Sequence, residues 1–220
     1  MKGSPKYPQI VAGPPRGSVL VLAPHADDES LGCGGAIALH HRQGDRVKVV
    51  VATDGAAGDP LGHYRGCNYR ELRRNEARRA ASILGIDEIE FWDYPDGKLA
   101  EVSDLMTRIT ALLAADRPDV LYRPSTLEVH PDHRALGVGV EAALQEYRPI
   151  CGDFCYEIWA TVQPTHAIDI TPIWDVKRQA VEQYESQLRY NDLLYMMAGL
   201  NAYRTIFAPW ARYVEAFQIG

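Results

Sequence analysis

The chain has 220 residues, a length typical of one globular domain, and 46% of them are apolar, which is enough to bury a core. Intrinsic disorder is therefore excluded. The formal net charge of −6 disfavours nucleic acid as a partner, because an acidic surface repels polyphosphate. No apolar run approaches the roughly 18–20 residues that a membrane-spanning helix needs, so we expect no membrane span.

The cysteines and the N-terminal segment indicate a reducing compartment. The first residues are rich in Pro and Gly and lack the apolar run of a secretory signal. We therefore expect a cytoplasmic protein with reduced thiols. Cys151 and Cys155 could share a metal, but no second pair accompanies them, so core or strand positions are the simpler interpretation.

Strand and helix patterns alternate along the first two thirds of the chain. Short runs of β-branched residues and leucine predict strands, and periodic apolar positions predict helices, two of them ending at Gly44 and Gly85. In chain order we expect strand 18–23, helix 31–43, strand 47–53, helix 68–84, strand 88–92, helix 102–115, strand 119–122 and helix 132–147. Four alternations with short connections predict an α/β fold, a Rossmann-like, mostly parallel sheet with helices on both faces.

The pattern changes near residue 150. Apolar runs over 154–160 and 166–170 predict two added strands. A helix is then expected, with Thr171 as its N-cap and Pro172 at its first position. The aromatic tail beyond it is expected to pack against the sheet or to form a rim.

Neither a linker nor an internal repeat interrupts the chain. We therefore expect a single domain over residues 1–220, with a catalytic core over about 18–147 and a C-terminal elaboration over about 150–220. A homo-oligomer, if one forms, is expected to use the aromatic tail as its contact surface.

Two clusters of His and Asp follow the first and fourth predicted strands. Residues 24–29 read PHADDE and residues 130–133 read HPDH. Ligands of open α/β sheets bind where the carboxyl ends of the strands meet. Two imidazoles and one carboxylate, with a fourth position left to water, are a common ligand set for catalytic zinc. The sequence thus predicts a zinc-dependent hydrolase.

Within these clusters we assign the metal ligands as His25, Asp28 and His133. Asp27 would face the water as the general base, because adjacent residues of a tight turn point in different directions. Taken singly, His25 could be a loop histidine, and the three acidic residues at 27–29 could cap the following helix. Asp132 could also be an N-cap. Because both clusters lie at the strand ends of one sheet, a metal site is a better interpretation than all of these alternatives combined.

PHADDE, the LGCGG that follows it and the later HPDH resemble the PIG-L/LmbE-like family of zinc-dependent N-deacetylases, over residues 19–144. The resemblance implies removal of an N-acetyl group from an N-acetylglucosamine-containing small molecule or glycoconjugate. It implies the same ligands and base, and it adds His130, which stabilises the tetrahedral intermediate or protonates the leaving amine, with Asp132 holding it. The family usually has Pro where this chain has Ala26, which loosens the turn but removes no reactive atom.

Four residues are candidates for substrate binding. Asp96, in the turn after the third predicted strand, resembles the family's sugar-binding aspartate, although Pro-Asp-Gly is equally a good turn sequence. Arg65 or Arg70 could reach a substrate hydroxyl or phosphate, although the arginines of the second helix are also explained as an exposed face of ion pairs. His63 could approach the site from a mobile lid.

Other functions fit parts of the sequence. An amidase that cleaves a larger acyl group or a thiol conjugate would use the same metal site, and an inactive carbohydrate-binding protein could share the fold. Nucleotide binding is disfavoured, because Gly32, Gly34 and Gly35 follow the turn rather than lie in it. Iron(II) or cobalt could replace zinc at such a site.

Overall fold

One sheet forms the frame of the molecule. The computed structural model describes residues 7–147, 149 and 151–220. The strands of this part are β1 (Gln9–Val11), β2 (Val19–Ala23), β3 (Val47–Thr53), β4 (Glu88–Tyr94), β5 (Val120–Pro124), β6 (Gly152–Tyr156), β7 (His166–Asp169) and β8 (Val214–Ile219). They form an eight-stranded sheet in the order β1-β7-β8-β6-β5-β2-β3-β4.

The centre of this sheet is parallel. Strand β2 pairs in parallel with β3 on one side and with β5 on the other, and β4 and β6 continue the parallel arrangement outwards. Strand β8 runs antiparallel between β6 and β7. The prediction of a Rossmann-like, mostly parallel sheet is confirmed.

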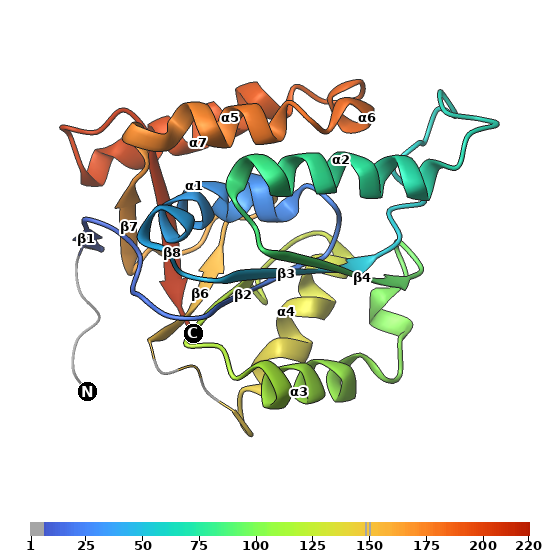
Figure 1. Cartoon of the computed structure of the whole chain (residues 1–220), viewed down its shortest axis with the longest axis horizontal. Coiled ribbons are helices and arrows are strands. Elements are labelled where there is room, and N and C mark those ends of the chain that lie inside the picture. The colour runs from blue at the N-terminus through green and yellow to red at the C-terminus, as the bar shows by residue number, and fades with distance from the viewer. Residues whose placement is uncertain (1–6, 148, 150) are drawn as a thin grey trace.

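Helices cover both faces of the sheet (Figure 1). One face carries α1 (Asp28–Gln43), α2 (Tyr69–Leu84), α5 (Trp174–Val181), α6 (Glu185–Leu188) and α7 (Leu193–Tyr203), and the other carries α3 (Leu105–Asp116) and α4 (Pro131–Ala143). Both α1 and α2 end at a left-handed glycine, Gly44 and Gly85, as predicted. Among the described residues, no helix has the length and apolar character needed to cross a membrane.

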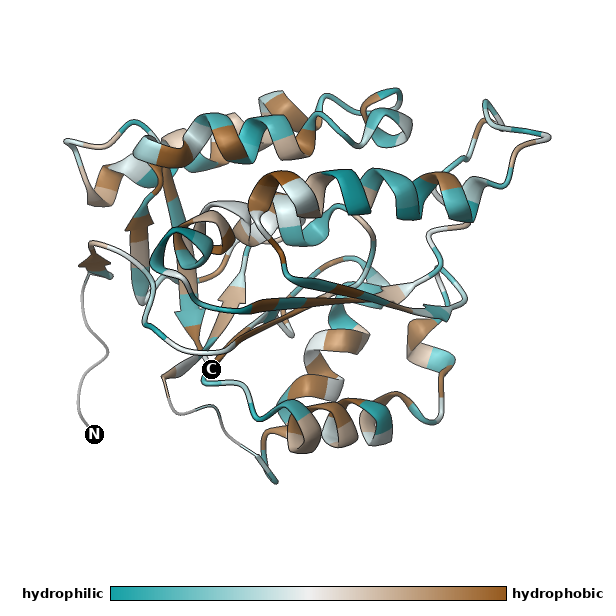
Figure 2. Ribbon diagram, viewed as in Figure 1, coloured by the Kyte–Doolittle hydropathy of each residue, from teal (hydrophilic) through white to brown (hydrophobic). Residues whose placement is uncertain are grey.

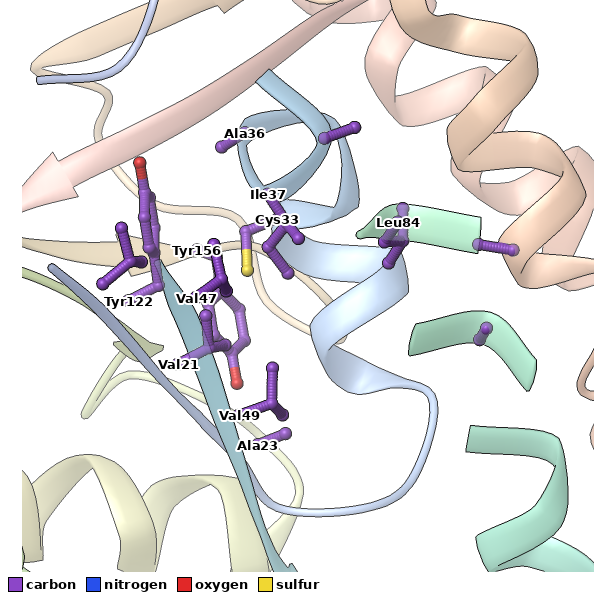
Figure 3. Packing of buried hydrophobic residues seen from close by; sticks show 14 of the residues in the cluster. Val21, Ala23, Cys33, Ala36, Ile37, Val47, Val49, Leu84, Tyr122 and Tyr156 are labelled. Carbon is purple, nitrogen blue, oxygen red and sulfur yellow. The ribbon is translucent and has the colours of Figure 1, made fainter. Parts of the chain in front are cut away.

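Strand β2 shows why the sheet holds two cores. All five of its residues are buried. Val19, Val21 and Ala23 pack into the core beneath α1 and α2, whereas Leu20 and Leu22 pack into the core above α3 and α4. Figure 2 shows the hydrophobic central strands, and Figure 3 shows the first of these cores. Burial on both faces is what a continuous apolar run predicts for a parallel strand.

The C-terminal strand β8 supports helix α1. This helix is interrupted at Cys33, whose φ is −141°. Beyond the break, the backbone N–H groups of Gly35 and Ala36 donate to the carboxylate of Glu215 on β8, at 2.7 and 2.8 Å. Lys177 neutralises that buried carboxylate at 2.6 Å. The element that begins with the PHADDE turn is therefore fixed by residues far along the chain.

The C-terminal part differs from its sequence-based prediction. Thr171 does not cap a long helix; its hydroxyl accepts from the N–H groups of Arg212 and Tyr213, and a 3₁₀ turn precedes α5. The aromatic tail contains helix α7 and strand β8, which the sequence did not predict. Strand β8 carries a glutamate among buried positions, so its pattern does not resemble that of a buried strand.

We predict that Gly32→Ala destabilises the protein. A Cβ at this position would lie 2.5 Å from Cδ2 of Tyr156, which is fully buried and donates to the carbonyl of Leu22. Overpacking of this kind costs about 1–3 kcal/mol of unfolding free energy, measurable by urea denaturation. Gly199→Ala is the matched control, because nothing lies within 4 Å of its Cβ. Equal stability of the two variants would contradict the proposed close contact.

Candidate active site

The PHADDE and HPDH loops leave neighbouring strands of the sheet. Strand β2 leads through α1 to β3 on one side, whereas β5 pairs with β2 on its other side and leads through α4 to β6. The strand order therefore reverses between β2 and β5, and such a point opens a crevice at the carboxyl ends of the strands. A cavity of about 340 Å³ lies there, lined by His25, Asp27, Asp28, Asp96 and His130 among others.

The backbone of the PHADDE turn is strained at Asp27. Its φ is 148° and its ψ is −26°, a region that residues other than glycine rarely adopt and that costs about 1–3 kcal/mol. Asp27 occupies the N-cap position of α1, yet its side chain makes no capping hydrogen bond. The helix-capping explanation therefore fails for this side chain, and the residue lines the cavity.

Three atoms with lone pairs converge beside this turn. His25 Nδ1 lies 3.2 Å from His133 Nε2, and each of these nitrogens lies 3.2 Å from Asp28 Oδ2. Ligands about 2.0 Å from a tetrahedral Zn²⁺ lie about 3.3 Å from one another, so this triangle has the dimensions of three corners of a zinc tetrahedron. The spacing of this triangle therefore fits a metal ion. Two further sets of potential ligand atoms lie within 4.8 Å of one another, and they are His25, His130 and His133 in one set and His25, Asp96 and Asp132 in the other.

Carboxylates orient His25 from its other nitrogen. His25 Nε2 lies 3.1 Å from Asp96 Oδ1 and 3.3 Å from Asp132 Oδ2. Burial lowers the pKa of His25, but hydrogen bonds with Asp132, Asp28 and Asp96 outweigh it and hold the pKa well above its usual value. The surroundings thus favour positive charge at this place. A carboxylate behind a metal-ligating histidine also fixes the tautomer that leaves the other nitrogen free to bind metal.

Asp132 does not hold His130 in the expected way. Its carboxylate accepts from the N–H groups of Gly97 and Leu99, at 2.7 and 3.0 Å, and contacts His25 instead. The contact with His130 is made by the backbone N–H of Asp132, which donates to Nδ1 at 3.2 Å. His130, not Asp132, is therefore the N-cap of α4. The Asp132 carboxylate does not contact His130 because the turn at Gly97 lies against it. The spacing of residues in the sequence does not reveal this contact.

His130 is suited to donate a hydrogen bond. Because its Nδ1 accepts from Asp132, the proton of the neutral ring lies on Nε2. Burial lowers the pKa of His130, and the neighbouring His25 and His133 lower it further. The ring centroid lies 4.8 Å from that of His25 and 4.9 Å from that of His133. At neutral pH His130 is therefore a neutral donor at the cavity wall.

Asp27 has the acidity of a general base. Burial raises its pKa to about 7, although the positive charge of Arg73 acts in the opposite direction. Arg73 is itself buried, donates to the carbonyl of Ala26 at 2.6 Å and lies 3.4 Å from the Asp27 carboxylate. A base with a pKa near the working pH is most effective in proton transfer. The sequence did not separate Arg73 from the other arginines of α2, since only the fold turns its side chain inwards.

Glu128 is a second residue that the sequence did not single out. It is fully buried, and its carboxylate oxygens make no hydrogen bond of good geometry among the described residues. Burial raises its pKa, although the backbone N–H groups of Ile158 and Ala160 lie near enough to oppose this rise. Oε2 lies 3.8 Å from Nδ1 of His133, which has no partner either. The carboxylate thus lies behind the His133 ring, as two carboxylates lie behind that of His25, but at ion-pair distance and not at hydrogen-bond distance. Its position two residues before HPDH is the only signal in the sequence.

The candidates for substrate binding separate into two groups. Asp96 lines the cavity, and its Oδ2 also accepts from the N–H of Ala57 at 3.0 Å. In the described part of the chain, His63, Arg65 and Arg70 are not among the cavity-lining residues. Arg70 pairs with Asp54 at 2.8 Å, and the ring of His63 stacks on that of Tyr190.

Comparison with known proteins gives concordant results. Residues 20–144 match the family model described as PIG-L: GlcNAc-PI de-N-acetylase. A diacetylchitobiose deacetylase of Thermococcus kodakarensis is 32% identical over 185 residues, which cover 77% of this chain and 69% of that protein. A 4-oxalmesaconate hydratase of Pseudomonas putida is 29% identical over 231 residues, with coverages of 93% and 89%. An N,N'-diacetylchitobiose deacetylase structure from Pyrococcus horikoshii aligns with a TM-score of 0.78 and 25% identity, covering 92% of this chain and 83% of that chain.

We predict that Glu128→Met weakens metal binding without weakening the fold. Removing an unpaired buried carboxylate should leave the unfolding temperature of the metal-free protein unchanged or raise it. Loss of the group behind His133 should lower zinc affinity about 10–100-fold, measured by competition with a chromophoric chelator. Glu101→Met, at an exposed site, is the control. Unchanged affinity in the Glu128 variant would show that Glu128 does not position His133.

Proposed function

The chain belongs to the PIG-L (GlcNAc-PI de-N-acetylase) family, and from this premise we propose that it is a zinc-dependent N-deacetylase. Its substrate would be an N-acetylglucosamine-containing small molecule or glycoconjugate. The observation that carries the proposal is the 3.2 Å triangle of His25, Asp28 and His133 atoms beside the carboxylate of Asp27. Deacetylases among the relatives support the same reaction.

His25 Nδ1, His133 Nε2 and Asp28 Oδ2 would hold the metal. Zinc bound there supplies Lewis acidity, which makes water a stronger nucleophile near neutral pH and polarises the amide carbonyl. Against the opposing effect of burial, the positive charge of His133, with hydrogen bonds from both rings, lowers the pKa of Asp28. Asp28 would likewise remain an anionic ligand with a bound metal ion in place of those ring protons. Proton transfer and stabilisation of the oxyanion are assigned to Asp27 and His130.

Asp27 moves the proton in this mechanism. It accepts a proton as the oxygen of water bonds to the acyl carbon, and it delivers that proton to the amine nitrogen as the C–N bond breaks. The products are acetate and a free primary amine. Its pKa of about 7 suits both the accepting and the donating step. Arg73 holds the carboxylate in place from behind.

His130 would stabilise the oxyanion that develops on the acyl oxygen. Its lowered pKa favours a neutral ring, whose Nε2–H donates a hydrogen bond. A donor fixed before the reaction stabilises the transition state more than the ground state. In this role His130 is a neutral hydrogen-bond donor and does not protonate the leaving amine. Asp27 protonates the amine instead.

We predict that Asp27→Asn retains zinc but loses turnover. The amide cannot accept the proton, so kcat should fall by about 10²–10⁴-fold while the metal still binds stoichiometrically. The control is Asp93→Asn, because Asp93 also has a positive φ, of 62°, but lies at the surface. Full activity of the Asp27 variant, measured as amine release, would remove Asp27 from the role of base.

The reaction itself is tested by release of primary amine from a panel of N-acetylglucosaminides. Inositol-, malate- and nucleoside-diphosphate-linked compounds, chitobiose and an aminoglycoside precursor would be offered to zinc-loaded and chelator-treated protein. We expect release from at least one compound, lost on chelation and restored by zinc. Silence of the zinc-loaded protein across the panel would contradict the proposed deacetylase, and water addition to a carbon–carbon double bond, as in a hydratase, would then be assayed.

A further inference from the structure

The cavity beside the metal-ligand candidates has a mixed lining. It combines the acid–base residues described above with several apolar side chains, between which Glu157, Thr161 and Asn191 are interspersed along the chain. The apolar side chains come from α7 and from the loop after β6, and they are those of Ile158, Trp159, Leu193, Met196, Met197 and Leu200. We call these six residues the apolar wall. Spacings of three, four and seven residues place the α7 members on one face of the helix.

The apolar wall extends from the interior to solvent. Leu193 and Met197 are 7% and 5% exposed, whereas Trp159 and Met196 are 49% and 45% exposed. Large apolar side chains that remain open to water at a cavity indicate an apolar ligand. Their partial exposure at the rim leaves room for a group that enters from solvent.

The charges beside the apolar wall disfavour an anionic substrate group there. Arg73 is the one Arg or Lys among its described lining residues, and it is engaged by Asp27 and the carbonyl of Ala26. Glu157 also lines the cavity, and its own charge is matched by Arg204, which pairs with it. At the apolar residues of the cavity, a phosphate or carboxylate would lose water and find no free Arg or Lys among the described lining residues.

We propose that the apolar wall is a subsite for an alkyl or aryl group of the substrate. The preferred substrates are uncharged N-acylated amino sugars that carry such a group close to the scissile amide. This inference rests on the proposed deacylation and names its substrate class. The apolar group belongs either to the aglycone or to the acyl chain, and the two sources present the same surface to the wall.

Four matched compounds test the substrate class. They are the methyl and hexyl glycosides of N-acetylglucosamine, a glycoside whose six-carbon chain ends in a carboxylate, and the methyl glycoside of N-hexanoylglucosamine. Each buried methylene contributes roughly a fourfold gain in binding, so we expect kcat/KM at least about tenfold higher for one hexyl-type compound than for the methyl acetamide. The carboxylate should cancel most of the gain of a hexyl aglycone. Equal kcat/KM of the methyl acetamide and both neutral hexyl-type compounds would overturn the inference.

A substitution at the rim tests the wall directly. Met196→Gln conserves size at a half-exposed position, so it should fold normally. We expect it to lower the ratio of kcat/KM between the preferred hexyl-type compound and the methyl acetamide several-fold. Met106→Gln makes the same change at an exposed position of α3 outside the cavity and should leave the ratio unchanged. An unchanged ratio in the Met196 variant would show that the apolar wall does not bind the hexyl group.

Binding separates this inference from the proposed function. Calorimetric titration of zinc-loaded protein measures the affinity for the same compounds without turnover. A hexyl-type compound could bind more tightly than the methyl acetamide, lose that affinity in Met196→Gln and yet release no amine. This result would support the subsite and contradict the proposed deacetylase. Amine release at equal rates from all neutral compounds, with equal affinities, would refute the subsite and leave the deacylase standing.

Discussion

The imidazole of His25 joins three segments that follow three different strands. The ring lies on the loop after β2, and its Nε2 contacts Asp96 from the turn after β4 and Asp132 in the first turn of α4, which follows β5. Its Nδ1 then faces Asp28 and His133. Carboxylates on both sides of one ring favour a positive charge at the centre of the site. A bound metal ion would supply that charge, and the spacing of the candidate ligand atoms fits one.

Much of the remaining structure supports this concentration of buried charge. Asp27, Asp28 and Glu29 are all buried, and one of them has a strained backbone. Isolated buried carboxylates are costly unless paired, and strain persists only where the surroundings fix it. Arg73 supplies the charge behind Asp27. Functional sites commonly break local rules of stability and are compensated elsewhere in this manner.

The proposed catalytic residues and the proposed substrate subsite come from different parts of the chain. The metal-ligand and acid–base candidates come from the parallel core, whereas the apolar wall comes from the region after β6. That region also fixes helix α1 through Glu215. The region after β6 thus holds helix α1 in place and contributes to the lining of the cavity. One relative is a hydratase, so a protein of similar sequence adds water in a reaction other than deacetylation.

The sequence alone determined the parallel core and the identity of the metal-ligand candidates, because both depend on local patterns. Continuous apolar runs mark strands buried on two faces, and the end of a parallel strand fixes the place of the residue that follows it. The tertiary structure alone decided which partner each side chain has. Asp132 contacts His25 rather than His130 through its carboxylate, Arg73 turns inwards to Asp27, Glu128 lies behind His133, and β8 enters the sheet beside β6. Most of these contacts join residues far apart in the chain, and all of them depend on strand register and side-chain direction, which no local spacing records.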